Sequence, residues 1–147
     1  PQGGRSLVIV FSDGDDTASW LSGRQVMDVA RQSDAVVYGV GLPGDPAETS
    51  GYLIDVRSGL QQGIPPVLPS ALTKPFLAAL AEESGGRYID AERSEGLSDA
   101  FTGIVNEFRS RYLLTYTPTG VDAAGWHPID VRVHAKGKVT ARRGYLR

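Results

Sequence analysis

The chain contains no cysteine. Disulfide bonds and thiolate sites, whether catalytic or metal-binding, are therefore excluded, although the absence does not identify a cell compartment. No apolar run approaches the roughly 18–20 residues of a membrane-spanning helix. The formal net charge of −2 gives no electrostatic basis for binding nucleic acid or an anionic membrane. The sequence also shows no nucleophilic triad, phosphate-binding glycine loop or zinc-site spacing.

A strand–helix–strand pattern opens the chain, whose 147 residues are 41% hydrophobic and suit one globular domain. Residues 5–11 are apolar after the first two, as in a strand covered on both faces. Ser22 and Gln25 fit a capping box at a helix start, and residues 35–41 form a second buried-type strand. Together these elements predict a βαβ unit with parallel strands. The predicted buried stripe of the helix comprises Val26, Val29, Ala30 and Ser33.

A second helix, a third strand and a third helix follow. The second helix is expected from Thr73, as its cap, to Gly85-Gly86, which ends it, and residues 87–90 predict a short strand. The third helix carries the clearest apolar stripe: Leu97, Phe101, Ile104, Val105, Phe108 and Tyr112. In the loop 42–72, with five prolines and four glycines, a short strand or hairpin is expected around 52–56 and an extended stretch at 64–67.

The apolar period changes from 3.6 to 2 after the third helix. Strands are predicted at 112–117, 129–134 and 139–143, with a turn at Lys136-Gly137 between the last two. Alternation of apolar and polar residues indicates a sheet with one face exposed to solvent, so this part is expected to be antiparallel. The sequence therefore predicts an α/β fold with a mostly parallel sheet over residues 1–111 and an antiparallel β extension over residues 112–147.

Polar residues follow the first strand directly, beginning with Ser12-Asp13-Gly14. In an open parallel sheet, ligands bind beyond the carboxyl ends of the strands, so Asp13 is the first candidate site residue. Carboxylate and hydroxyl oxygens suit a hard cation such as Mg²⁺, but one Asp and a few hydroxyls supply only part of such a site. Helix capping in contact with solvent is the simpler interpretation of the polar residues that follow. These residues are Asp15, Asp16, Thr17 and Ser19.

A phosphatase is the alternative. Residues 13–17 match DxDxT, the nucleophile loop that haloacid-dehalogenase-like phosphatases carry after a hydrophobic strand. That resemblance would make Asp13 the nucleophile and Asp15 the acid/base, with Mg²⁺ neutralising the phosphate. The chemistry also needs a later lysine and an acidic pair at a strand end. Lys74 lies in a predicted helix start, and Asp90 opens no acidic pair.

As a whole, the chain resembles the second half of a von Willebrand factor type A domain, and more narrowly the bacterial VWFA-related domain proteins. Four stretches carry the resemblance: FSDGDDTAS, AVVYGVGL, LAALAEESGGRYI and FRSRYLLTYTP…IDVRVHAKGKVTARRGY. Type A domains are doubly wound, Rossmann-like α/β folds with a metal-ion-dependent adhesion site. The resemblance implies that Asp13, with Ser12 beside it, binds Mg²⁺ (or Mn²⁺ or Ca²⁺). No DxSxS motif is present, so metal binding by this chain alone is expected to be weak or absent.

The resemblance also implies the function, a non-enzymatic recognition or adhesion module. Its protein partner would complete the metal shell with an acidic side chain. Without the first strands of the family fold, strand 7–11 is expected to self-associate or to pair with the missing half of the domain. Relatives of this kind are exported, which predicts an extracytoplasmic location. The residues expected to surround the partner are Asp15, Asp16, Thr17, Ser19, Leu42 and Pro43.

Overall fold

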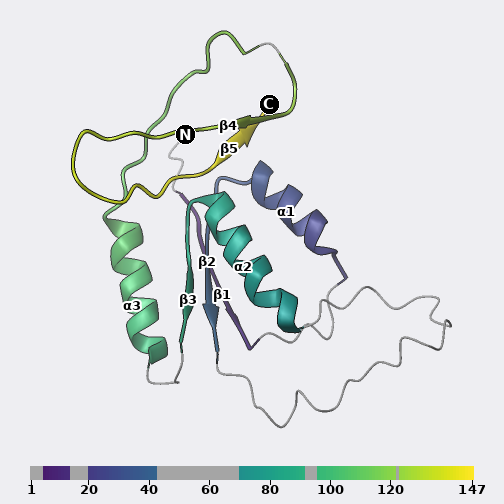
Figure 1. Cartoon of the computed structure of the whole chain (residues 1–147), viewed down its shortest axis with the longest axis vertical. Coiled ribbons are helices and arrows are strands. Elements are labelled where there is room, and N and C mark those ends of the chain that lie inside the picture. Colours follow the sequence, from purple (N-terminus) through teal and green to yellow (C-terminus); the bar gives the residue numbers. More distant parts are fainter. Residues whose placement is uncertain (1–4, 14–19, 43–69, 92–95, 122) are drawn as a thin grey trace, which may run out of the picture.

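A three-stranded parallel sheet forms the centre of the computed structural model, which describes residues 5–13, 20–42, 70–91, 96–121 and 123–147 (Figure 1). Its strands, in spatial order, are β1 (Leu7–Ser12), β2 (Val36–Gly41) and β3 (Tyr88–Asp90). The helices are α1 (Gly23–Gln32), α2 (Ser70–Ser84) and α3 (Gly96–Arg109). A separate antiparallel pair joins β4 (Trp126–Pro128) to β5 (Gly144–Leu146). The predicted α/β class and the parallel pairing of successive strands are confirmed.

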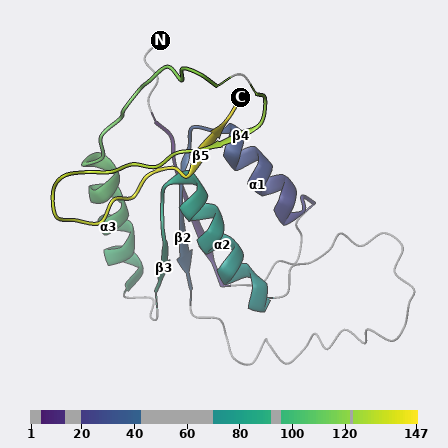
Figure 2. The same ribbon diagram turned by 45° about the horizontal axis from the view of Figure 1, so that its top comes forward.

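β2 is buried along its whole length, because helices cover both of its faces. Side chains of a strand alternate between the two faces of the sheet. Tyr38 and Val40 pack with Ile104 of α3, whereas Val37 packs with Leu77 of α2. Figure 2 shows α3 on one side of the strands and α1 and α2 on the other. Because both faces of β2 are covered, its sequence is a continuous apolar run rather than an alternating one.

α1 begins at the predicted capping box. The Ser22 hydroxyl accepts a hydrogen bond from the backbone N–H of Gln25, and the Gln25 side chain accepts one from the Ser22 N–H. The predicted buried stripe is wrong at one position. Val29 is 61% exposed, and Met27 packs toward α2 instead. The unbranched Met27 side chain can fill the irregular gap between two helices, which a stiff valine fills less well.

The junction between α2 and β2 is tightly packed. Ser84 is buried, and its hydroxyl accepts a hydrogen bond from the Val37 N–H at 2.8 Å and donates one to the Ala81 carbonyl at 2.9 Å. Gly85 ends α2 with a positive φ of 85°. A Cβ at Gly86 would overlap the Val37 carbonyl oxygen. The predicted Gly85-Gly86 stop is confirmed, and the second glycine also permits the close approach of helix and strand.

Two helix boundaries differ from the predicted ones. α2 begins at Ser70 rather than at a cap on Thr73, and α3 ends at Arg109 before reaching Tyr112. Tyr112 is 88% exposed and Phe101 is 49% exposed, so neither belongs to the core. A sheet of three strands is too narrow to cover the whole apolar stripe of α3, which leaves one side of that stripe in solvent. The strand or hairpin expected around 52–56 and the extended stretch at 64–67 lie outside the described residues.

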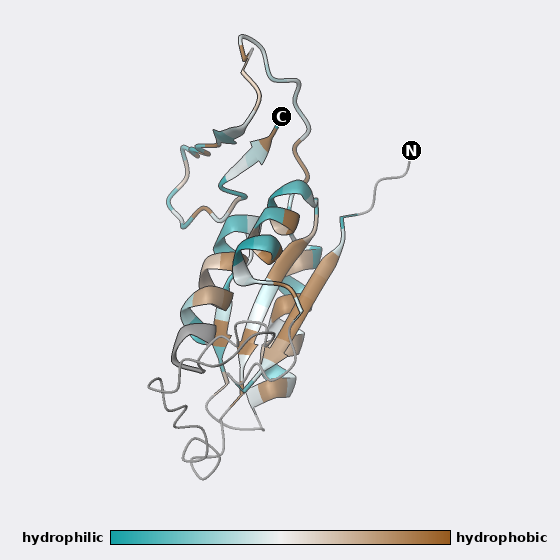
Figure 3. Ribbon diagram, turned by 90° about the vertical axis from the view of Figure 1, so that its right-hand side faces the viewer, coloured by the Kyte–Doolittle hydropathy of each residue, from teal (hydrophilic) through white to brown (hydrophobic). Residues whose placement is uncertain are grey.

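The three strands predicted in the carboxyl-terminal part are wrong. Residues 112–117, 129–134 and 139–143 form no strands, and the two short strands lie elsewhere. The ladder stops soon after Pro128, which has no N–H, because the Arg143 N–H bonds to the Glu83 carbonyl of α2 at 3.3 Å. The Arg143 carbonyl still accepts a hydrogen bond from the Ile129 N–H at 2.8 Å, but the Arg143 N–H bonds to the helix, so the ladder ends at this residue. Figure 3 shows the strongest apolar colouring in the strands of the parallel sheet.

This carboxyl-terminal part nevertheless packs on α1 and α2. The Arg142 guanidinium donates to the Arg31 carbonyl and to the Asp34 carboxylate. The Arg31 guanidinium lies 5.0 Å from the centre of the Trp126 ring, a cation–π contact. Arg143 also pairs with Glu82. Arg31 at the end of α1, together with Arg142 and Arg143 just before β5, thus holds the β4–β5 pair against the α/β part.

Candidate functional site

The three strand ends lie side by side at the carboxyl edge of the sheet. Ser12 pairs in register with Gly41, and Gly41 pairs with Asp90. Paired residues of parallel strands point to the same face, so the Ser12 and Asp90 side chains both point toward α1 and α2. Two strand spacings, about 9–10 Å, separate them. Asp13 follows β1 directly at this edge and is exposed.

Tyr88 lies across the two glycines of β2. A Cβ at Gly39 would lie 2.8 Å from the Tyr88 ring, and a Cβ at Gly41 would overlap the Tyr88 hydroxyl. The glycines therefore make the space in which the ring lies over the middle strand. Burial raises the pKa of the Tyr88 hydroxyl above its ordinary value of 10.0, and the charge of Asp90 raises this pKa further, whereas Lys74 lowers it.

Lys74 brings a positive charge to the same edge. Its ammonium group pairs with the Asp90 carboxylate and lies 5.7 Å from the centre of the Tyr88 ring. Both members of the ion pair are more than half exposed, so their attraction is screened by solvent. Lys74, Tyr88 and Asp90 thus form a polar cluster beside the row that contains Ser12. The carboxyl edge therefore carries charges of both signs.

The end of β1 is tied to the end of β2. The Leu42 N–H donates to the Ser12 carbonyl at 2.8 Å, and Leu42 is half-buried. Leu42 is thereby held close to the candidate metal ligands Ser12 and Asp13. The other residues predicted to surround a partner lie outside the described residues: Asp15, Asp16, Thr17, Ser19 and Pro43.

The candidate metal ligands are few. Within the described ranges, no three His, Cys, Asp or Glu side chains gather closely enough to hold a metal ion. Asp13 and Ser12 could offer one carboxylate and one hydroxyl oxygen. A hard cation such as Mg²⁺ accepts those ligands and keeps several waters in the remaining positions. The described residues therefore supply at most one side of a metal site.

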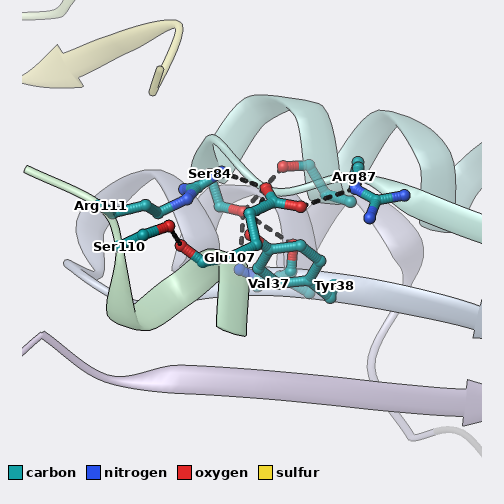
Figure 4. Close-up of polar contacts among 8 residues, drawn as sticks. Val37, Tyr38, Ser84, Arg87, Glu107, Ser110 and Arg111 are labelled. Carbon is teal, nitrogen blue, oxygen red and sulfur yellow. Dashed lines mark hydrogen bonds and ion pairs between the residues drawn. The ribbon is translucent and has the colours of Figure 1, made fainter. Parts of the chain in front are cut away.

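A second polar cluster lies away from this edge, where α3 meets the sheet (Figure 4). The Glu107 carboxylate accepts hydrogen bonds from the Tyr38 hydroxyl at 2.7 Å, from Arg87 at 2.9 Å and from Arg111 at 3.2 Å. The Arg111 guanidinium also lies 5.5 Å from the centre of the Tyr38 ring. Tyr38 is fully buried, so its hydroxyl needs this partner. We interpret the cluster as a structural link between α3, β2 and β3.

The charges of this cluster shift two pKa values. Burial raises the pKa of the Tyr38 hydroxyl to about 12, and its hydrogen bond to Glu107 contributes to that rise. Burial alone would raise the pKa of the Glu107 carboxyl group. The hydrogen bonds from Tyr38, Arg87 and Arg111 outweigh burial and lower this pKa below its ordinary value. Both shifts favour a neutral tyrosine and a charged glutamate.

Reasoning from the sequence did not identify either polar cluster, although one sequence feature points to each. Gly39 and Gly41 lie on the same face of a strand that is otherwise apolar. Two such glycines indicate that a side chain from a neighbouring element lies over that face of the strand. Tyr38 in the same buried strand requires a hydrogen-bond partner. The partners Lys74 and Glu107 are distant in sequence, so the pattern shows the need for a partner without identifying it.

Comparison with known proteins adds little. No model of a known protein family matches the chain, and no curated protein matches it. A solved structure from Vibrio fischeri, described as an uncharacterized membrane-spanning protein, resembles it with 21% identity and a TM-score of 0.46. The match covers 71% of this chain and 48% of that one, so the chain spans about half the length of its neighbour. A score at this level supports no argument about function.

The same comparison corrects the predicted location. The resemblance to exported proteins implied an extracytoplasmic chain, whereas the solved structure is described as membrane-spanning. The extracytoplasmic prediction is contradicted and is withdrawn, and we assign no location in its place. Among the helices that the structure describes, none has the length and apolar character needed to cross a bilayer.

Proposed function

We propose that the chain is a non-enzymatic protein-recognition module, the second half of a doubly wound von Willebrand type A domain. The observation that carries the proposal is the position of Asp13, directly after β1 at the carboxyl edge of a parallel sheet. This edge is where open α/β sheets bind ligands. The packing of α3 on one face and of α1 and α2 on the other supports the doubly wound arrangement.

In this function, a divalent cation bridges the module and its partner. Asp13 supplies a carboxylate oxygen and Ser12 a hydroxyl oxygen, and Mg²⁺ is the cation that best suits such ligands, with Mn²⁺ or Ca²⁺ as substitutes. A carboxylate from the partner completes the metal shell. That bond orients the partner as well as neutralising charge. Because the chain offers few ligands, we expect its affinity for the free cation to be weak.

The neighbouring cluster favours an acidic partner. The Lys74 side chain is 61% exposed at the same edge, so its ammonium group, which pairs with Asp90, is also accessible to a partner carboxylate. Leu42, tied to Ser12 through its N–H, adds apolar contact area beside the cation. A partner that presents a carboxylate next to a small apolar group would match both features.

A titration with a defined probe tests this function. The ¹⁵N-labelled protein is titrated with a short glycine-rich peptide that carries one glutamate, in excess Mg²⁺. We expect the amide signals of Asp13 and Leu42 to shift. The shifts should disappear with EDTA, with the glutamine version of the peptide, and in Asp13→Asn. The matched control is Asp28→Asn, which removes an exposed carboxylate from α1 and should change nothing.

Persistence of the shifts in EDTA or in Asp13→Asn would refute the metal bridge. Shifts confined to the β4–β5 region would refute the assigned edge. If Asp13→Asn and wild type bind the peptide equally and the signals of the edge still move, the module is a scaffold whose metal site is vestigial.

A phosphatase is the second candidate, and one specific observation favours it. That chemistry needs a lysine and a later acid near the nucleophile, and Lys74 pairs with Asp90 at the same edge as Asp13. The two strand spacings between β1 and β3 argue against direct cooperation of Asp13 and Asp90. Hydrolysis of p-nitrophenyl phosphate with Mg²⁺, lost in Asp13→Asn, would establish the phosphatase and reject the recognition module.

The open edge of β1 is the second surface that we propose for a partner. β1 has one described neighbour, β2, and its other edge faces outward. Edge strands with apolar side chains are templates for a further strand. Pairing at this edge requires no metal, so it can be tested separately from the Asp13 site.

A further inference from the structure

Charge is distributed unevenly along the chain. Residues 112–147 contain six Arg or Lys side chains and two Asp, whereas the net charge of the whole chain is −2. This carboxyl-terminal part therefore has a net charge of +4, and the residues before it have a net charge of −6. The total charge gives no electrostatic basis for an anionic partner, but it conceals a basic part for which that basis exists.

The basic part lies beyond one end of the sheet. Figures 1 and 3 show residues 112–147 beside the end at which the strands begin. The hydrogen bonds agree with this placement, because Arg142 donates to the carbonyl of Arg31 in the last turn of α1. The carboxyl edge of the sheet, with Asp13, is at the opposite end. A partner bound to the basic part would therefore leave that edge accessible.

A long exposed loop carries two lysines that can meet an external anion. All ten residues of 132–141 are exposed. The ion pairs described in residues 112–147 involve Arg132, Arg142 and Arg143, and among the described residues they leave Lys136 and Lys138 free. The loop also contains two exposed valines, at 133 and 139. The loop thus offers positive charge beside small apolar side chains.

An exposed apolar segment belongs to the same part of the molecule. Residues 112–117 form no helix or strand, and all six are exposed. Leu113 is 62% exposed and Leu114 is 77% exposed. Outside a helix, the side chains of consecutive residues point to roughly opposite sides of the chain. The segment is therefore apolar and accessible on two sides, and such a concentration of exposed apolar residues marks an interaction surface.

We propose that the carboxyl-terminal part binds the surface of an anionic lipid bilayer. Leu113 and Leu114 enter the boundary between headgroups and acyl chains, and the exposed lysines of the loop bind the anionic headgroups. Apolar area and electrostatic attraction together determine the strength of this kind of binding. Tyr112 and Tyr116 flank the leucines, and tyrosine is enriched at the level of the headgroups because one end of its side chain is apolar and the other polar.

The two exposed sides of the segment favour lipid over other anionic partners. A folded protein covers one side of a segment, whereas a fluid lipid phase can surround both Leu113 and Leu114. Nucleic acid attracts basic side chains through its phosphates and stacks its bases on aromatic rings, but it provides no apolar phase for leucine. Lipid is therefore the partner that uses the lysines and the leucines together.

Co-sedimentation with vesicles tests the inference. The whole chain is mixed with vesicles of phosphatidylcholine and phosphatidylserine, and separately with vesicles of phosphatidylcholine alone. We expect binding to the anionic vesicles. The double variant Lys136→Gln with Lys138→Gln should lower the partition coefficient roughly tenfold or more. The double variant Leu113→Asp with Leu114→Asp should lower it at least as much. All four side chains are exposed, so both double variants should keep the thermal unfolding midpoint of the wild type.

The matched controls change exposed side chains of the same kinds on α1. They are Arg24→Gln and Val29→Asp, and both should bind the anionic vesicles as the wild type does. Added salt should weaken the binding of the wild type more than that of the lysine variant, because salt screens the attraction to the headgroups. Neither EDTA nor Asp13→Asn should change vesicle binding, so failure of the metal site and failure of lipid binding are separable.

Three results would overturn the inference. The first is the absence of binding to anionic vesicles. The second is binding that the leucine variant retains in full, which would mean that no side chain of 112–117 enters the lipid. The third is binding to single-stranded DNA at the same salt concentration without binding to vesicles, which would identify nucleic acid as the anionic partner.

Discussion

At the scale of single residues, one carboxylate links α3 to the sheet. Glu107 accepts hydrogen bonds from Tyr38 on β2 and from Arg87 just before β3. If this carboxylate were lost, the Tyr38 hydroxyl would be buried without a hydrogen-bond partner. The desolvation penalty of such an unsatisfied group is larger than the net stabilisation that the hydrogen bond itself provides. The residue pattern alone locates Tyr38 in the core but does not reveal Glu107, which is 69 positions away.

Replacing Glu107 by glutamine should destabilise the protein. The charge that Arg87 and Arg111 contact disappears, and we expect a loss of about 1–2 kcal/mol in the free energy of unfolding. Urea denaturation measures it. The matched control is Glu82→Gln, which breaks an exposed pair with Arg143 and should cost less than about 1 kcal/mol. Equal losses in the two variants would contradict the role of Glu107.

The same cluster should respond to pH at both extremes. The pKa of Tyr38 rises from 10.0 to about 12 on folding, so its contribution to stability is complete below pH 10 and is lost as the pH rises toward 12. The pKa of Glu107 is lowered, so its contribution is present above the ordinary carboxyl value and is lost as the pH falls through the folded pKa. Unfolding curves should show a weaker alkaline loss in Tyr38→Phe than in wild type. An identical alkaline loss would contradict the shift.

At the scale of elements, close contacts between helix and strand depend on glycine. Gly86 touches the Val37 carbonyl and Gly41 lies under the Tyr88 hydroxyl, so neither position has room for a Cβ. The sequence predicts that Gly85-Gly86 ends a helix, because glycine accepts a positive φ. The need for Gly86 comes from the neighbouring strand, which only the three-dimensional packing reveals.

An alanine at residue 86 should therefore be severely destabilising. The new Cβ forces α2 away from β2, at a cost of about 3 kcal/mol or more. Gly103→Ala is the matched control, because it lies in α3 with nothing within 4 Å of the added atom. It should stabilise the protein by up to about 1 kcal/mol through helix propensity. Thermal unfolding distinguishes the two, and a tolerated Gly86→Ala would contradict the packing of this junction.

At the scale of the whole molecule, prediction from sequence succeeds where a local pattern defines an element. β1 and β2 follow from continuous apolar runs and α1 follows from a capping box. The apolar run of β1 does not report full burial, because Val8 and Phe11 are each 42% exposed. The strands expected at 129–134 and 139–143 are absent: the ladder ends with the bond from the Ile129 N–H to the Arg143 carbonyl, because the Arg143 N–H bonds to α2. The position of Asp13 follows from the chain order of strand and turn, whereas the pairing of Lys74 with Asp90 depends on tertiary packing.

Paramagnetic broadening by Mn²⁺ tests most directly whether Asp13 helps to bind a cation at the carboxyl edge. In the ¹⁵N-labelled chain, substoichiometric Mn²⁺ should broaden the amide signals of Ser12, Asp13 and Leu42 and leave that of Glu107 sharp. The broadening should be lost in Asp13→Asn and kept in Asp28→Asn. Broadening that persists in Asp13→Asn, or that centres on another part of the chain, would contradict a cation site at the end of β1.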